Sequence, residues 1–180
     1  MSIFNRKKEM NIEIGEIKES LVDYSKSIKE LTIHYDEQLE IIKQERNDLA
    51  TLELMMLGYG IDFIEWIKDV FKIELTLGEE SLSEFDIILE DIHQMYIKNG
   101  LREEVLNDLL KKCSGYFGIV ILSNYKGNWV DSNLGPAIQA NGVNAFVYNC
   151  IRKRIQSNED SDIIAFYYAL GESLDENFLM

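Results

Sequence analysis

An apolar residue recurs at every seventh position along the N-terminal third of the chain. The series is Ile14, Leu21, Ile28, Tyr35, Ile42, Leu49 and Met56. The companion positions three residues later are Ile17, Tyr24, Leu31, Gln38, Glu45 and Leu52. Side chains at this spacing share one stripe of a helix, so the pattern predicts a long amphipathic helix over residues 11–57 with a coiled-coil seam in its first half.

This predicted helix is too long to lie on one small domain. At ~1.5 Å per residue it would extend about 70 Å, well beyond the diameter of the rest of the chain. We therefore expect a homodimer through residues 11–37. Its interface residues would be Ile14, Ile17, Leu21, Tyr24, Ile28, Leu31 and Tyr35. The alternative is a helical hairpin that folds back on its own chain, for instance onto residues 61–72.

The rest of the chain, residues 58–180, has the signals of a compact domain that begins at Gly58-Tyr59-Gly60. Amphipathic patterns predict helices over residues 61–71, 83–100, 101–123, 146–156 and 160–170, and an acidic tail over 172–180. A capping box formed by Ser81 and Glu84 would start the second of these helices, and Gly171 would end the last. The expected fold class is α+β and mostly helical, divided into residues 1–57 and 58–180.

Shorter alternating segments predict a small antiparallel sheet. The expected strands cover residues 127–131 and 136–140, and an Asn141-Gly142 hairpin turn leads into a third strand at Val143. Residues 73–77 alternate in the same way and are expected to form a separate half-buried strand. Glycines inside the 101–123 helix, Gly115 and Gly118, predict that another element approaches its backbone closely. The end of that helix, residues 119–122, could instead be a strand.

Charge and composition exclude several classes of protein. Thirty-two acidic residues against 18 basic ones give a formal net charge of −14, so a nucleic-acid backbone would be repelled. No apolar segment approaches the ~20 residues that a membrane span needs, and no signal peptide is recognised. Cys113 and Cys150 belong to no metal-binding spacing. We expect a cytoplasmic protein with reduced cysteines, no cofactor and no metal.

Few residues are candidates for a functional site. His34 and His93 are expected to have structural roles. Trp129 with Asp131 could bind a ligand at a strand end, or the indole could pack over the helix that contains Gly115 and Gly118. The basic cluster is Arg152, Lys153 and Arg154. It could contact an anion or a carboxylate, or complement the negative end of its own helix. The Phe166-Tyr167-Tyr168 run is expected to be core with a hydrated flank.

Several short motifs occur in a characteristic order over residues 73–170. They are Ser81-Leu-Ser-Glu-Phe-Asp86, Gly115-Tyr-Phe-Gly118, Gly127-Asn-Trp-Val130, Pro136, Phe146, Arg152-Lys-Arg154 and Ile163 to Leu170. This order resembles an uncharacterised bacterial α+β domain family with a Ser-Leu-x-x-Leu-Asp helix start, a Gly-x-Tyr-x-Gly helix, a Gly-x-Trp-Val strand and a terminal Phe-Tyr helix. The chain departs from that pattern at Ile119, where the family has an acidic residue. The resemblance implies a bacterial cytosolic domain and no particular reaction.

Three functions are compatible with these observations. The first is a non-catalytic module that binds a basic protein partner, with immunity proteins that block basic toxins as the concrete example. The second is a hydrolase or transferase, or a small-molecule-binding domain, with its site near Trp129, Asp131 and the basic cluster. The third is a dimeric structural adaptor acting through the N-terminal helix. No catalytic residue is assigned.

Overall fold

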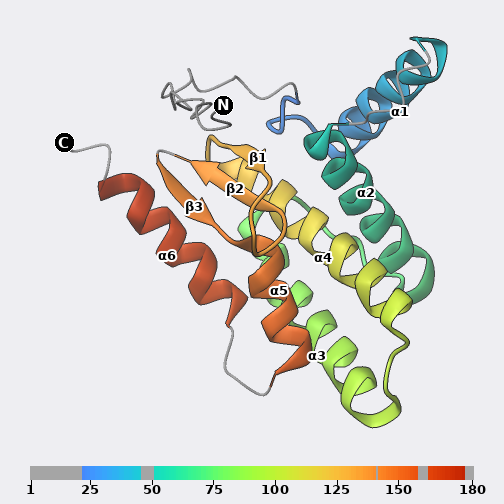
Figure 1. The fold of residues 1–180 in the computed structure, drawn as a ribbon, viewed down its shortest axis with the longest axis vertical. Coiled ribbons are helices and arrows are strands. Elements are labelled where there is room, and N and C mark those ends of the chain that lie inside the picture. Colours follow the sequence, from blue (N-terminus) through green and yellow to red (C-terminus); the bar gives the residue numbers. More distant parts are fainter. Residues whose placement is uncertain (1–21, 46–50, 141, 158–161, 177–180) are drawn as a thin grey trace, which may run out of the picture.

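The computed structural model describes residues 22–45, 51–140, 142–157 and 162–176, and confirms a mostly helical α+β fold with a small antiparallel sheet. Its elements are α1 (Ile28–Glu45), α2 (Leu52–Phe71), a 3-10 turn (Glu79–Ser81), α3 (Leu82–Asn99), α4 (Glu103–Asn124), β1 (Asn128–Val130), β2 (Ala137–Ala140), β3 (Val143–Ala145), α5 (Val147–Gln156) and α6 (Ile163–Glu176). Helix α4 runs through the middle, with α2 on one side and the sheet, α5 and α6 on the other (Figure 1). None of the helices in the described ranges is both long and apolar enough to cross a lipid bilayer.

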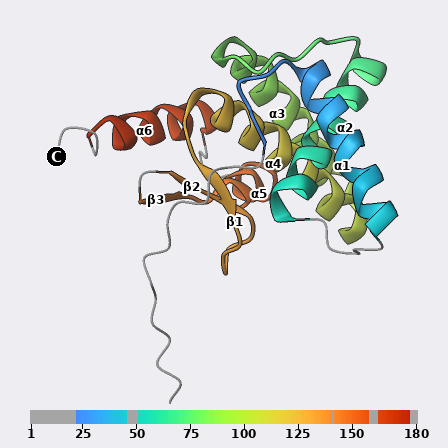
Figure 2. The ribbon, with the colours of Figure 1, turned by 90° about the horizontal axis from the view of Figure 1, so that it is seen from above.

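Helix α1 begins much later than predicted. Residues 22–27 form bends and turns, and a capping box starts the helix: the Ser27 hydroxyl and amide both donate to the Glu30 carboxylate, at 2.6 and 3.0 Å. A second helix start follows at Thr51, whose hydroxyl accepts from the Leu54 amide at 3.2 Å. The prediction of one helix over residues 11–57 is therefore wrong. Helix α1 instead folds back against α2, the hairpin arrangement considered as the alternative (Figure 2).

The described residues of the predicted dimer seam pack against the core of their own chain. Tyr24 is only 4% exposed and Leu31 2% exposed, and both belong to the hydrophobic core. Ile28 and Tyr35 are half-buried against the same core. Tyr24 and Leu31 are therefore not available to a second copy, and Ile28 and Tyr35 are already partly covered by their own chain, which corrects the predicted interface. The remaining members, Ile14, Ile17 and Leu21, lie outside the described residues.

The sequence predicted a helix that begins only after Gly58-Tyr59-Gly60. Helix α2 instead runs through these residues without a break. Gly58 lies under the Tyr35 ring, and Gly60 lies against the backbone of Gly115 in α4. Both glycines allow close packing of a neighbouring element, so Gly58-Tyr59-Gly60 does not end a helix as predicted. The predicted domain boundary at 57/58 is not a boundary, because it falls inside α2, whose N-terminal residues Leu54, Met56 and Leu57 contribute to the same core as the rest.

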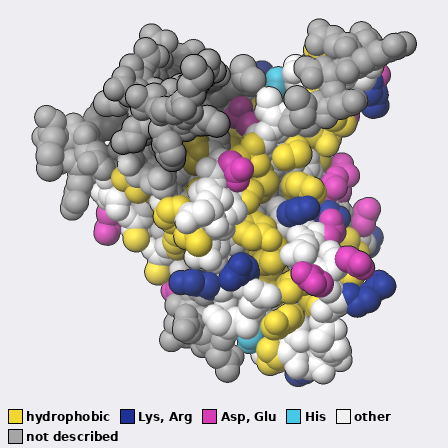
Figure 3. Space-filling view, in the orientation of Figure 1, with side chains coloured by type: hydrophobic (Ala, Val, Ile, Leu, Met, Phe, Trp, Pro, Cys, Tyr) yellow, Lys and Arg dark blue, Asp and Glu magenta, His cyan; other side chains and the backbone are white. Residues whose placement is uncertain are grey.

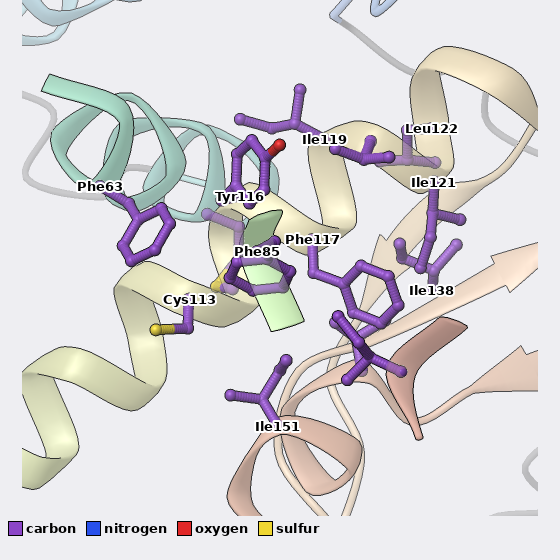
Figure 4. Close-up of a cluster of buried hydrophobic side chains, with 14 of the residues drawn as sticks. Phe63, Phe85, Cys113, Tyr116, Phe117, Ile119, Ile121, Leu122, Ile138 and Ile151 are labelled. Carbon is purple, nitrogen blue, oxygen red and sulfur yellow. The ribbon is translucent and has the colours of Figure 1, made fainter. Parts of the chain in front are cut away.

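Helix α4 is the centre of that core. All residues from Cys113 to Leu122 are buried, so this helix packs on every side, as expected of a helix that is apolar all round. The rings of Phe63 in α2 and Phe85 in α3 meet Tyr116 at 5.5 and 4.9 Å between centroids, and Ile138 of β2 and Ile151 of α5 belong to the same buried cluster (Figure 4). The prediction of a central, tightly packed helix is confirmed, and residues 119–122 are helical.

The sheet follows the predicted hairpin. Strand β2 lies between β1 and β3 and is antiparallel to both, with Trp129 opposite Ile138 and Ile138 opposite Ala145. The turn between β2 and β3 places Gly142 at a φ of 79°, which favours glycine. Because the strand pairs bring residues 127–145 together locally, the turn signal was sufficient to predict this part of the fold.

Residues 73–77, predicted as a strand, form no strand and join no sheet. Side chains bind their backbone instead: the Thr76 amide donates to the Ser81 hydroxyl at 2.8 Å, and the Tyr116 hydroxyl donates to the Thr76 carbonyl at 2.9 Å. Ser81 therefore makes no cap hydrogen bond to α3, and the predicted Ser81–Glu84 capping box is wrong.

The ends of the last predicted helices also differ in part. Helix α3 ends as predicted, with Gly100 at a φ of 62°. Helix α6 was predicted to stop at Gly171 and to be followed by an acidic tail, but it continues to Glu176. Gly171 instead gives room to the Tyr125 side chain, whose hydroxyl would collide with a β-carbon at this position. Residues 177–180 of the predicted tail lie outside the described residues.

Candidate functional site

Trp129 belongs to the core and not to an open binding site. Its indole is 7% exposed and lies directly on Gly118 of α4, where any β-carbon would collide with the ring. The prediction that the indole packs over this helix is confirmed. Asp131, two residues further on, is exposed. The two residues of the proposed pair therefore differ in surroundings: Trp129 lies in the core, whereas Asp131 follows the end of β1 and is exposed to solvent.

Tyr24 lies near Trp129, and each of the two side chains has a buried polar atom. Among the described residues, neither the Tyr24 hydroxyl nor the Trp129 Nε1 atom has a hydrogen-bond partner. Burial raises the pKa of Tyr24, the Glu53 carboxylate raises it further, and the nearby indole N–H partly offsets the rise. The two groups are close, but their geometry falls short of a hydrogen bond. An unsatisfied buried group costs about 1–3 kcal/mol, so polarity at this position does not stabilise the fold.

Arg154, the last member of the basic cluster, binds two carboxylates of the same chain. Its Nε donates to Asp86 at 3.0 Å and its Nη1 to Glu90 at 2.9 Å, which ties α5 to α3. Hydrogen bonds from Gln94 and then from Arg154 lower the pKa of Glu90. The expected carboxylate contact is therefore present, but internal. Arg152 and Lys153 are exposed.

The position of the cluster also fits the helix-end prediction. Lys153 and Arg154 occupy the last turn of α5, where cations complement the negative end of the helix. Within the described residues, no hydrogen bond or ion pair joins Arg152, Lys153 or Arg154 to the segment of Trp129 and Asp131. The structure thus does not assemble the five predicted binding residues into one polar network.

The histidines have surroundings of a structural kind. His93 of α3 is buried, and its Nδ1 lies 2.8 Å from the Ile155 carbonyl oxygen of α5, so it joins the same two helices as Arg154. The predicted hydrogen-bonded role is confirmed for this residue. His34 is half-buried on α1. In the part of the chain that the structure describes, no three His, Cys, Asp or Glu side chains are grouped so that they could hold a metal ion.

Both cysteines are buried free thiols. Burial raises the pKa of Cys150 to about 12 and raises that of Cys113 as well. The thiolate is the nucleophilic form of cysteine, and at neutral pH neither residue would supply it. Cys113 and Cys150 therefore offer no nucleophile for catalysis while the protein is folded.

The Phe166-Tyr167-Tyr168 run forms core with a hydrated flank, as predicted. Tyr167 is fully buried and Tyr168 is exposed. Their hydroxyls donate to the two oxygens of Glu79, at 3.1 and 3.3 Å, which holds α6 against the 3-10 turn. Sequence reasoning missed this Glu79 clamp because its partners are nearly ninety positions apart in the chain.

The outer side of α1 was also missed as a candidate surface. Ile33 and Ile41 are exposed there, with Asp36, Glu37 and Glu40 between them. These residues lie off the seven-residue apolar series, which drew attention to the opposite stripe of the helix. Two isoleucines eight positions apart on the solvent side were the available signal.

Comparison with protein-family models, curated proteins and solved structures found no match. The family resemblance of residues 73–170 therefore stays a prediction.

Proposed function

We propose that this protein is a non-catalytic interaction module of the bacterial cytosol that binds a basic protein partner, with an immunity-type neutraliser as the concrete form. The net charge of −14 is the observation that carries the proposal. A strongly acidic surface accelerates association with a basic protein and selects it over acidic competitors.

The surroundings of the chemically capable side chains support binding over catalysis. The thiols of Cys113 and Cys150 are buried, and the Arg154 guanidinium is engaged by Asp86 and Glu90. Trp129, the aromatic residue of the alternative site, packs inside the core. Each of these groups already has a structural role, whereas many carboxylates remain on the surface.

Affinity capture from a lysate of the native host tests this proposal. The tagged full chain should retain one basic protein in near-stoichiometric amount at moderate salt. Binding of the purified pair should weaken steeply as salt is raised, because exposed charges are screened beyond about 8 Å at physiological ionic strength. Recovery of the bait alone, or of a partner whose affinity does not depend on salt, would contradict the proposal.

A further inference from the structure

One side of α1 packs against α2 and the opposite side faces outward at the edge of the molecule (Figure 2). We call this outward side the α1 face, formed by Ile33, Asp36, Glu37, Glu40 and Ile41. The two isoleucines are 49% and 44% exposed, and all three acidic residues are exposed. Every exposed residue between positions 33 and 41 is thus either apolar or acidic.

Negative charge extends from the α1 face onto α2. Tyr35 lies between the two helices over Gly58, and its pKa is raised first by burial, then by the charges of Asp62 on α2 and Asp36 on α1. Most acidic side chains visible in Figure 3 lie on the side of the molecule where α2 runs. Lys43 contacts Glu40 at 2.7 Å, and among the described residues no ion pair involves Asp36 or Glu37.

We propose that the α1 face docks a basic amphipathic segment of a partner protein. Ile33 and Ile41 lie eight residues apart, about 12 Å along the helix, and would contact apolar side chains of the segment. Asp36, Glu37 and Asp62 would pair with its lysine or arginine side chains. This inference rests on the proposed function and assigns it a surface.

The charges favour a basic partner over a second copy of this chain. Two α1 faces in contact would bring Asp36, Glu37 and Glu40 of one copy against the same carboxylates of the other, and like charges across an interface are unfavourable. A basic amphipathic segment would make favourable contacts with both kinds of side chain, apolar contacts with the isoleucines and ion pairs with the carboxylates.

Helix α3 offers a matched control. Ile87 is 63% exposed, and Asp91, one turn further on, is also exposed. This pair repeats the residue types and the four-residue spacing of Ile33 and Glu37, on a helix outside the α1–α2 hairpin. Ile87→Ser with Asp91→Asn removes one exposed isoleucine and one negative charge at a surface that the proposal does not use.

The first test measures binding of the full chain to a fluorescently labelled synthetic amphipathic peptide of leucine and lysine by anisotropy at low salt. Ile33→Ser with Ile41→Ser, and Asp36→Asn with Glu37→Gln, should each weaken binding about tenfold. The α3 variant should bind like the wild type, and a leucine–glutamate peptide should not bind. Equal weakening by the α3 variant, or unchanged binding by the α1 variants, would overturn the proposal. Circular dichroism checks that each variant is folded.

Two further outcomes separate this inference from the proposed function. If a salt-sensitive partner from the lysate is retained equally by the α1 variants, the α1 face is not its docking surface, although the proposed function stands. Sedimentation of the wild type as a dimer that the α1 variants disperse would assign the face to a second copy and overturn the proposal. Absence of any salt-sensitive partner would instead contradict the proposed function itself.

Discussion

Gly60 of α2 and Gly115 of α4 lie backbone to backbone where the two helices cross. A β-carbon on Gly60 would lie 2.8 Å from the carbonyl carbon of Gly115, and one on Gly115 would lie 2.5 Å from the Gly60 amide nitrogen. Neither neighbour is a flexible side chain that could turn away. The contact therefore requires glycine on both helices.

We expect Gly60→Ala and Gly115→Ala each to lower the free energy of unfolding by about 2–3 kcal/mol, because the added methyl group forces the helices apart. This loss should exceed the gain of ~1 kcal/mol that alanine brings to helix propensity. Urea denaturation measures both. Asn107→Ala, on the exposed side of α4, is the control and should be neutral or slightly stabilising; loss of stability there, or none at the glycines, would contradict the packing argument.

Arg154→Met should lower the free energy of unfolding by about 1–2 kcal/mol at neutral pH, because it removes two charge-assisted hydrogen bonds between α5 and α3. The carboxylates of Asp86 and Glu90 are partly exposed and become hydrated, which limits the loss. Lys112→Met removes an ordinary surface pair with Asp108 and should cost less than about 0.5 kcal/mol. Equal effects of the two substitutions would refute a special role for Arg154.

The contribution of Arg154 should also depend on pH. The pKa of Glu90 is lower in the folded protein than its ordinary value of 4.5, so the stabilisation is present above that value and is lost as pH falls through the folded pKa. The difference in stability between the wild type and Arg154→Met should shrink in acid. Denaturation curves collected from neutral to acidic pH provide the measurement, and a constant difference would show that the ion pair does not matter.

Tyr24→Phe should be neutral or stabilising by up to about 1 kcal/mol, because the hydroxyl it removes is buried and has no hydrogen-bond partner among the described residues. Tyr24→Ala should cost about 3 kcal/mol, since it leaves a cavity beside Trp129. In a Trp66→Phe background the emission of Trp129 should shift to longer wavelength only in the alanine variant. A clear loss of stability in Tyr24→Phe would mean that the hydroxyl does form a stabilising interaction.

Alkaline pH should unfold the protein through its buried tyrosines. Burial is the main cause that raises the pKa of Tyr24, Tyr116 and Tyr167 above the ordinary value of 10.0. Their contribution is fully present below pH 10.0 and declines as pH rises above it, because the unfolded chain loses these protons first. Tyrosinate absorbance and helical circular dichroism should therefore change together for these residues. Complete ionisation before any loss of helix would contradict the burial of the three rings.

Local signals predicted much of the C-terminal half. The Asn141-Gly142 turn was enough to place β2 and β3, and Gly100 marked the end of α3 because a left-handed residue there favours glycine. The packing of Trp129 on Gly118 could also be anticipated, since a glycine inside an apolar helix indicates close approach.

The apolar series of the N-terminal third was correct as a pattern and misleading as a structure. Its period shows that one stripe is buried but does not show which surface buries it, and Leu31 turned out to pack in the core of its own chain. The Ser27–Glu30 capping box marked a helix start in the sequence and was overlooked. The glycines were ambiguous too: from sequence alone, Gly58 and Gly60 could indicate either a break in a helix or a close contact with a neighbouring element.

Contacts between distant positions could not be read from local patterns. The ion pairs of Arg154 with Asp86 and Glu90, and the Glu79 clamp of Tyr167 and Tyr168, join residues that share no periodicity or turn. Each of these residues could be recognised in the sequence as charged or aromatic. Which residue it contacts depends on how α3, α5 and α6 pack around α4.

The ten-residue stretch from Cys113 to Leu122 has no side that faces water. Its amide protons can therefore meet solvent only when the surrounding helices and the sheet separate. In deuterated buffer these amides should be the last to exchange, and their rates should follow the stability of the whole molecule. Deuterium uptake by α4 would thus report the stability of the whole protein. Any ligand that stabilises the folded chain would slow this uptake, wherever on the surface the ligand binds.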